Sequence, residues 1–357
     1  MTRTLTILLL AAVVTAINTS RCGKKAHAED PGGQPAVNDS SFRNPILSSG
    51  PDPWVVRKDG YYYYMHTLAN RIAIWKTDKM SQLSKASITT VWSPSEGAPH
   101  SKNIWAPELH FLNGKWYIYY TAGEGDISTQ RIYVLENTAA DPTQGAWTEK
   151  GKIYDKSADL YAIDGTVMEN YNGHDYFIWS GNPSATDNKQ CIYISRMSDP
   201  WTLETPRVLI SAPQYEWETR GAPPAVNEGP EILKNSQGRV FLVYSASACW
   251  TDDYTLGLLS LKEGGDPLDP ADWIKTPQPV FLKNAESGAY GPGHNGFFKS
   301  PDGKEDWILY HANSLPGQGC KDNRNPRIQR FTWKQDGTPD FGTPVKINVP
   351  MAVPSGE

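Results

Sequence analysis

The sequence predicts an all-β protein, and more narrowly a five-bladed β-propeller. Its 357 residues include 13 Trp and 18 Tyr, which are typical of strands, and 30 Gly and 28 Pro, which are typical of turns. A pattern of strand, tight turn and aromatic strand recurs five times along the chain. Several strands repeated at a period of about fifty residues indicate propeller blades, whereas a β-sandwich would give no reason for the recurrence.

The five repeats share one order: a first strand, a turn that ends in Gly, an aromatic strand and a third strand. The first strands are expected at 54–56, 109–112, 163–168, 228–233 and 291–298. The turns are Asp59-Gly60, Asn113-Gly114, Asn172-Gly173, Gln237-Gly238 and Asp302-Gly303. The second strands are expected at 61–66, 116–120, 176–179, 240–244 and 307–311, and the third at 72–75, 131–135, 191–194, 255–259 and 327–333. Asx-Gly between two apolar runs is a strong hairpin signal, and Gln237-Gly238 takes the same place in the fourth repeat, so each repeat is expected to begin as a β-hairpin.

The N-terminus is typical of an exported protein. A short cationic start leads into an apolar block at residues 5–17, which is too short to span a membrane and fits a secretory signal. We expect residues 1–28 to be a signal peptide cleaved after Ala26-His27-Ala28, residues 29–41 to be a flexible leader, and residues 42–350 to form the propeller domain. The expected location is secreted or periplasmic. A surface lipoprotein attached through Cys22 is the alternative, although Thr19-Ser20-Arg21 is a poor lipobox.

The charge and the cysteine content of the chain argue against some classes of function. A net charge of −5 and no basic stripe argue against nucleic-acid binding, which needs clustered cations. Three cysteines remain in the mature part, and we expect Cys249 and Cys320 to form a disulfide, because both lie in Gly-rich loops of the late repeats. The spacing of the cysteines does not match that of the ligands in a zinc site. We expect a monomer with no membrane span.

Ionisable residues stand at comparable places in the five repeats. Asp52, Glu108, Asp164, Glu228 and His294 follow one another at spacings of 56, 56, 64 and 66 residues. The innermost strand of each propeller blade runs beside the central channel, so these side chains should converge at one mouth of it. Gathered carboxylates repel one another, which makes an active site the natural inference. Two of them suffice for glycoside hydrolysis.

The motifs around these residues resemble glycoside hydrolase family 43, and the similarity extends from residue 43 to about residue 346. The motifs are Gly50-Pro51-Asp52-Pro53, Trp105-Ala106-Pro107-Glu108, Ile163-Asp164-Gly165-Thr166, Glu228-Gly229-Pro230-Glu231 and Gly291-Pro292-Gly293-His294-Asn295. The resemblance implies a five-bladed propeller and an inverting hydrolase. It implies Asp52 as general base, Asp164 as the residue that tunes the pKa of the acid, and Glu228 as general acid. Glu231 is the competitor for the acid role.

The resemblance also implies substrate contacts. Trp105, which begins the second repeat beside the mouth, is expected to stack on a sugar, and a packing role is the alternative. The family pattern implies that Arg324 reaches the sugar or the acid, while Arg327 pairs structurally. His294 matches the central histidine of the family and is expected under the sugar. No cofactor is required for the chemistry, but a structural Ca²⁺ in the channel near His294 is a further expectation. A buried histidine without a ligand is the alternative for His294.

The segment Cys249–Tyr254 and the terminal Arg-x-x-Arg-x-Gln are most similar to single-domain exo-acting α-L-arabinofuranosidases. We therefore expect an exported enzyme that releases L-arabinofuranose from α-linked arabinan or from arabinose side chains of plant polysaccharides. The alternatives are an endo-arabinanase or β-xylosidase of the same family, a related propeller fructosidase that acts with retention, and a silent propeller that only binds glycan.

Overall fold

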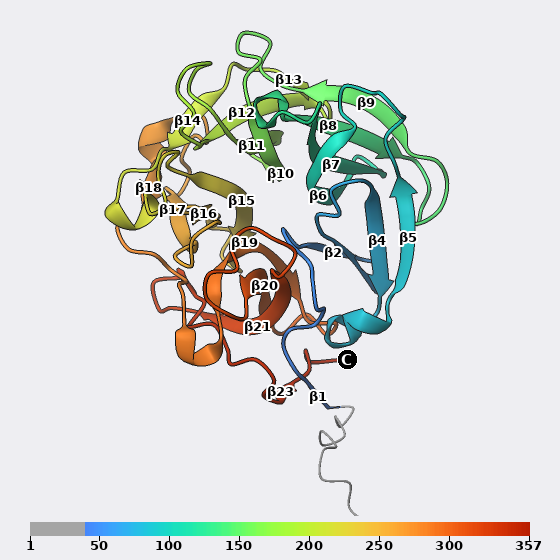
Figure 1. Ribbon diagram of the computed structural model, residues 1–357, viewed down its shortest axis with the longest axis vertical. Coiled ribbons are helices and arrows are strands. Elements are labelled where there is room, and N and C mark those ends of the chain that lie inside the picture. The colour runs from blue at the N-terminus through green and yellow to red at the C-terminus, as the bar shows by residue number, and fades with distance from the viewer. Residues whose placement is uncertain (1–39) are drawn as a thin grey trace, which may run out of the picture. The chain divides into compact units, whose positions relative to one another are not determined.

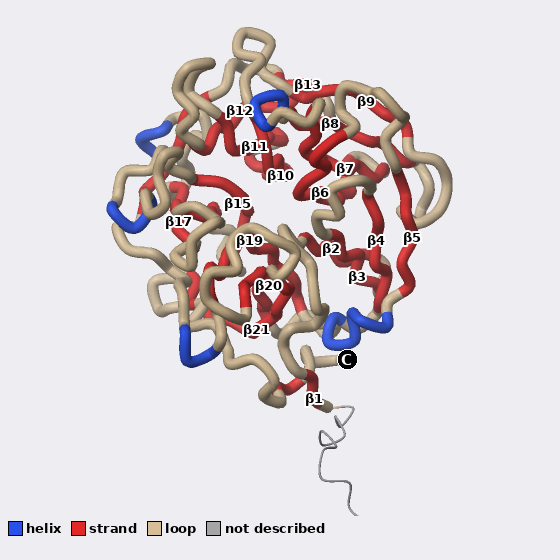
Figure 2. Tube along the Cα trace, in the orientation of Figure 1, coloured by secondary structure: helices blue, strands red, loops and turns tan. Residues whose placement is uncertain are grey.

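The structure, a computed structural model, describes residues 40–357. The expected signal peptide and nearly all of the expected leader lie outside these residues. The described part is built of strands, with short 3-10 helices between them (Figure 2). Its sheets are arranged around one centre, as a propeller (Figure 1). The all-β prediction and the five-blade prediction are confirmed.

Each blade is an antiparallel sheet made from consecutive strands. The first two blades are β2 (Trp54–Lys58), β3 (Tyr61–Met65), β4 (Ile72–Thr77), β5 (Ser87–Trp92), and β6 (Lys102–Leu112), β7 (Lys115–Gly123), β8 (Arg131–Asn137), β9 (Thr148–Ile153). The third is β10 (Ala162–Tyr171), β11 (His174–Gly181), β12 (Cys191–Asp199), β13 (Thr202–Leu203) and β14 (Val208–Ser211). The last two are β15 (Asn227–Lys234), β16 (Val240–Ala246), β17 (Thr255–Leu261), β18 (Trp273–Lys275), and β19 (Tyr290–Lys299), β20 (Asp306–Asn313), β21 (Asn325–Trp333), β22 (Pro339–Asp340). The 3-10 helices are η1 (Met80–Lys85), η2 (Ile127–Thr129), η3 (Glu216–Glu218), η4 (Pro270–Asp272) and η5 (Ala285–Ser287).

The outer strand of each blade was not predicted. In β5, for example, the residues Ser87–Trp92 are mostly exposed or half-buried. A strand at the outer edge of a sheet has no buried face to impose an alternating apolar pattern, so its sequence carries a weak signal.

The ring closes through its innermost strands. Each contacts the innermost strand of the next blade: β2 with β6, β6 with β10, β10 with β15, β15 with β19, and β19 with β2. A separate apolar cluster fills the space between each two neighbouring blades. Between the last blade and the first, Tyr62 and Tyr64 pack with Phe298 and Trp307. Each blade therefore buries both faces, which explains why its middle strands are apolar without alternation.

The two ends of the described chain meet at the last blade. The short strands β1 (Ser41–Phe42) and β23 (Met351–Ala352) pair in an antiparallel manner. The Asn44 side chain donates to the carbonyl of Ile328 at 2.8 Å and accepts the Ile328 N–H at 3.0 Å. These bonds fasten the segment before the first blade to the last blade, and so hold Asp52 against that blade.

One backbone feature recurs at the channel. Near the start of each innermost strand the backbone turns through a left-handed residue, with φ of 54° at Asp52, 42° at Ala106, 55° at Asp164, 51° at Gly229 and 48° at His294. In four of the blades the strand pairing shifts register at this point. Such bulges bend a strand and aim side chains away from the sheet. They place Asp52, Asp164 and His294 at one equivalent position, whereas Glu228 precedes it and Glu108 follows it.

Candidate active site

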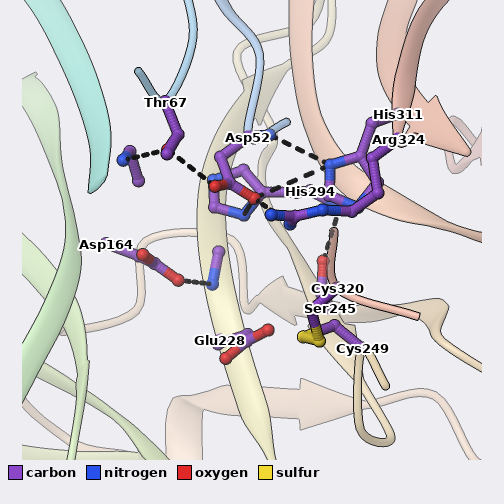
Figure 3. A network of polar contacts seen from close by, with 12 residues as sticks. Asp52, Thr67, Asp164, Glu228, Ser245, Cys249, His294, His311, Cys320 and Arg324 are labelled. Atoms are coloured by element: carbon purple, nitrogen blue, oxygen red, sulfur yellow. Dashed lines mark hydrogen bonds and ion pairs between the residues drawn. A yellow bond between two sulfur atoms is a disulfide. The ribbon is translucent and has the colours of Figure 1, made fainter. Parts of the chain in front are cut away.

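The three predicted catalytic carboxylates line a single cavity of about 270 Å³. Asp52 lies just before β2 in the first blade, Asp164 on β10 in the third, and Glu228 on β15 in the fourth. Figure 3 shows their carboxyl groups turned toward a common space. The predicted sugar contacts Trp105, His294 and Arg324 line the same cavity. Four of the five residues expected to converge from the repeats therefore line one cavity, and Glu108 does not.

Asp52 is held by several polar partners. Its Oδ1 accepts a hydrogen bond from Arg324 Nη1 at 2.6 Å, and its Oδ2 accepts one from the Thr67 hydroxyl at 2.7 Å. Its backbone N–H donates to His311 Nδ1 at 3.0 Å. Burial alone would raise the pKa of Asp52, but the Arg324 guanidinium, together with the two neighbouring histidines and Thr67, holds the pKa of that carboxyl well below its usual range. Asp52 is therefore ionised at neutral pH.

The pKa of Glu228 is shifted in the opposite direction to that of Asp52. Burial raises the pKa of Glu228 to about 7, although a hydrogen bond from the Tyr254 hydroxyl to its Oε1, at 2.8 Å, opposes that shift. Burial also raises the pKa of Asp164 well above its usual range, and the charges of Glu228 and Asp52 add to this. Two buried carboxyls that interact this closely keep a proton at neutral pH more readily than either would in water.

A glycine brings Asp164 and Glu228 together. The Gly229 N–H, next to Glu228, donates to Asp164 Oδ2 at 3.0 Å. Gly229 has φ of 51°, and a Cβ placed on it would lie 3.2 Å from His294 Nδ1. A side chain here would be strained and crowded against His294. Glycine is therefore required for the fourth blade to approach the channel this closely.

His294 lines the cavity next to Asp52. It is 6% exposed, its backbone N–H donates to the Ser245 hydroxyl at 2.8 Å, and its Nδ1 lies 3.5 Å from Asp52 Oδ1. Burial lowers the pKa of His294, while the Asp52 charge opposes this.

The surroundings of His294 offer few ligands for a cation. Within residues 40–357, no group of three or more His, Cys, Asp or Glu side chains is placed to hold a metal ion. The nearby Asp52 is already paired with the Arg324 guanidinium, whose charge would repel a cation. Because calcium prefers six to eight oxygen ligands, the protein atoms alone do not fit it. The calcium ion expected near His294 stays a prediction.

Glu108, the remaining carboxylate aligned in the repeats, lies with His110 and Glu231 and not with the three carboxylates of the cavity. It is 3% exposed, and its Oε2 lies 2.9 Å from His110 Nε2. Burial raises the pKa of Glu231, and the charge of Glu108 and a hydrogen bond between the two carboxyl groups add to this. Among the described residues, those lining the cavity include Glu228 but neither Glu231 nor Glu108. The placement favours Glu228 over Glu231 for the acid role.

Arg324 and Arg327 have different surroundings. The guanidinium of Arg324 donates to Asp52 at 2.6 Å and lines the cavity. The contact of Arg324 with the sugar or the acid stays a prediction. Arg327 is fully buried, and its Nε donates to the Asn325 side chain at 2.9 Å.

Several residues of the site were not found from the sequence. Thr67 and His311 contact Asp52 from a loop and from β20, and neither has a local sequence signal. Tyr254 and Trp250 belong to the segment Cys249–Tyr254, which was noted only for its family likeness. The predicted disulfide between Cys249 and Cys320 is confirmed, and both cysteines line the cavity.

Comparison with known proteins agrees with this geometry. A sequence model of the glycosyl hydrolases of family 43 matches residues 42–339. The chain is 40% identical to a protein of Streptomyces avermitilis named extracellular exo-alpha-(1->5)-L-arabinofuranosidase, over 97% of this chain and 72% of that protein. It is 38% identical to alpha-L-arabinofuranosidase 43 of Humicola insolens, over 87% of this chain and 64% of that protein.

A solved structure is also similar. The crystal structure of alpha-L-arabinofuranosidase from Lactobacillus brevis matches with a TM-score of 0.81 and 37% identity, over 86% of this chain and 98% of that chain. The resemblance stated from the motifs is confirmed. The chain belongs to glycosyl hydrolases family 43 and is a glycoside hydrolase.

Proposed function

We propose that this protein is an exported, inverting exo-α-(1→5)-L-arabinofuranosidase, which releases L-arabinofuranose from arabinan or from arabinose side chains of plant polysaccharides. The observation that carries the proposal is a pair of carboxyl groups in one cavity with opposite pKa shifts. The pKa of Asp52 lies well below its usual range, while that of Glu228 is raised to about 7. One group is ready to accept a proton and the other to give one.

In the proposed reaction, Asp52 accepts a proton from a water molecule as its oxygen attacks the anomeric carbon. The bond from that carbon to the leaving oxygen breaks, and Glu228 protonates the leaving oxygen. Asp164, bonded to the Gly229 N–H, keeps the proton in the acid pair by its proximity. Arg324 and Thr67 orient Asp52 toward the water. The residues supply both acid and base, so the proposal requires no cofactor.

The names of the relatives support the sugar and the location. Both proteins compared above are named arabinofuranosidases, and the one from Streptomyces avermitilis is named extracellular and exo-acting. None of the helices among residues 40–357 has the length and apolar character that crossing a membrane requires. A glycan-binding propeller without activity is less well supported, because all three carboxylates are present and line one cavity.

Product analysis tests the substrate, the mode of cleavage and the stereochemistry together. On debranched arabinan we expect arabinose as the first product at every time point, because an exo enzyme removes terminal residues. By proton NMR the first anomer from an α-arabinofuranoside should be β, as single displacement by water inverts the anomeric carbon. Branched arabinan and xylo-oligosaccharides serve as comparison substrates. Early release of oligosaccharides would indicate an endo-arabinanase, release of xylose a β-xylosidase, and an initial α anomer a retaining enzyme.

The pH profile tests the role of Glu228. An acid must be protonated to act, so kcat/KM should fall as pH rises through about 7, the pKa of Glu228. The base must be ionised, and since the pKa of Asp52 is lowered, the acidic limb should lie below the usual carboxylate range. Tyr254→Phe removes the hydrogen bond that lowers the pKa of Glu228. We expect it to move the alkaline limb up by about one pH unit, the worth of one hydrogen bond to a charged group.

Tyr119→Phe is the matched control for that variant. Tyr119 is buried and also loses one hydrogen bond, from its hydroxyl to the carbonyl of Pro200, but it lies outside the cavity. Its alkaline limb should coincide with that of the unmodified enzyme. An alkaline limb that stays in place in Tyr254→Phe would show that Glu228 does not set it.

A further inference from the structure

The Cys249–Cys320 disulfide joins two loops that each hold one of the catalytic carboxylates. Cys249 lies in the loop between β16 and β17 of the fourth blade, and Cys320 in the loop between β20 and β21 of the fifth. Both sulfur-bearing residues line the cavity of the active site. Figure 3 draws the disulfide in the same view as Glu228 and Arg324.

Each loop ends in a residue that contacts a carboxylate. Tyr254 lies at the end of the fourth-blade loop and donates to Glu228 Oε1 at 2.8 Å. Arg324 lies at the end of the fifth-blade loop and donates to Asp52 Oδ1 at 2.6 Å. Each of them is separated from its half of the disulfide by only a few residues, so a movement of the cysteines would be transmitted to both.

Apart from the disulfide, these loops are held mainly by polar contacts, among them the hydrogen bonds from the Gly291 N–H to the Asp252 carbonyl at 2.9 Å and from the Gly50 N–H to the Arg324 carbonyl at 3.0 Å. Residues 314–324 contain neither helix nor strand, and Leu315 is 62% exposed. In the fourth-blade loop Trp250 is 48% exposed. A second link between the loops is the hydrogen bond from the Gly317 N–H to Asp252 Oδ1 at 2.8 Å. Polar contacts in partly exposed segments open more easily than a packed core, so the covalent link adds to them in fixing the geometry of the two loops.

We propose that the Cys249–Cys320 disulfide is a positioning device for catalysis, which fixes the partner of the general acid and the partner of the general base relative to each other. This inference rests on the proposed function, because it takes Glu228 as the acid and Asp52 as the base. It assigns the disulfide a role beyond the stabilisation that a cross-link between residues 71 apart gives to any fold.

The test compares the double variant Cys249→Ser/Cys320→Ser with the unmodified enzyme on an aryl α-L-arabinofuranoside. We expect kcat to fall by about ten- to a hundred-fold, the effect of a misplacement of about 1 Å in a catalytic group, with a smaller change in KM. Both limbs of the pH profile should move to higher pH. The reason is that Arg324 lowers the pKa of Asp52 and Tyr254 lowers that of Glu228, and both contacts would loosen.

Other ionisable groups that face these carboxylates lie outside the two loops, and we expect them to stay in place in the variant. They come from blades that the disulfide does not join, or from the innermost and middle strands of the fifth: Tyr64, His66, Tyr161, Asp164, His294 and His311. An upward shift of both limbs therefore reports on Arg324 and Tyr254 together.

Cys191→Ser is the matched control. Cys191 is a buried free thiol in the apolar cluster between the second and third blades, so its replacement lowers stability without touching either loop. It should lower the melting temperature while leaving kcat and the pH profile unchanged. If the double variant behaves in the same way, the disulfide is a structural cross-link and the inference is overturned.

Reduction of the unmodified enzyme covers the case in which the double variant does not fold. Both cysteines are half-buried and line the cavity, so a phosphine can reach them. At a temperature where circular dichroism shows the reduced protein folded, kcat should fall and should return on reoxidation. Undiminished activity of the reduced protein would refute the positioning role alone. An oxidised, unmodified enzyme that cleaves no arabinofuranoside would instead refute the proposed function.

Discussion

Asp52→Asn is expected to lower kcat/KM on arabinofuranosides by about three orders of magnitude, within the range that general base catalysis contributes. An amide cannot take the proton of the attacking water. Asparagine has the same shape as aspartate and tolerates the left-handed backbone at this position, where φ is 54°. The loss should therefore appear in activity, while circular dichroism shows an unchanged fold.

The chain offers a close control for this substitution. Asp59 adopts the same conformation, with φ of 52°, but lies in an exposed hairpin turn of the same blade. Asp59→Asn repeats the chemical change and the backbone requirement away from the cavity, and kcat/KM should stay within about two-fold of the unmodified value. Activity of folded Asp52→Asn within ten-fold of the unmodified enzyme would exclude Asp52 as the base.

Glu228→Gln is expected to have an effect that depends on the leaving group. On an arabino-oligosaccharide, whose leaving alcohol must be protonated, kcat should fall by about 10²- to 10⁴-fold. On a nitrophenyl arabinofuranoside the loss should be much smaller, because nitrophenolate leaves without a proton. The alkaline limb of the pH profile should also disappear, since the group that titrates there at about pH 7 is gone. Initial rates on the two substrates across a range of pH values measure both effects.

Glu231→Gln separates the two glutamates that compete for this role. Glu231 lies on the same strand, β15, and is 3% exposed beside Glu108, while the residues described as lining the cavity include Glu228 and not Glu231. Its substitution should leave the ratio of the two rates unchanged, whatever it does to stability. If Glu231→Gln instead shows the leaving-group dependence and Glu228→Gln does not, the acid has been assigned to the wrong residue.

The carboxylates were predictable because their signal is local and repeated. Asp52, Asp164 and Glu228 each stand next to Gly or Pro at the start of an apolar run, and five copies of one supersecondary unit must place equivalent residues at one axis. The repeat was a less reliable guide to the exact position of a residue within one blade. Glu108 was aligned with the others, but the bulge in that blade centres on Ala106, and so Glu108 lies beyond the bend.

The partners of the carboxylates were harder to predict. Thr67 is 15 residues from Asp52 in the chain, while His311 is 259 and Arg324 is 272 residues away. Arg324 was singled out through the family resemblance, but its hydrogen bond to Asp52 was not predicted. No local pattern connects two residues at such distances, because their contact exists only once the last blade has closed on the first.

The sequence by itself determined the blade count and the convergence of the three carboxylates, because every blade must repeat the pattern that buries both of its faces. The motifs around these residues identified the family. Tertiary structure supplied the physical cause that moves the pKa values of the two carboxyls apart. The pKa of Asp52 is lowered by a guanidinium of the fifth blade, and that of Glu228 is raised by burial at the channel. Both pKa shifts depend on groups that different blades bring together. The shifts therefore arise only when the ring is closed.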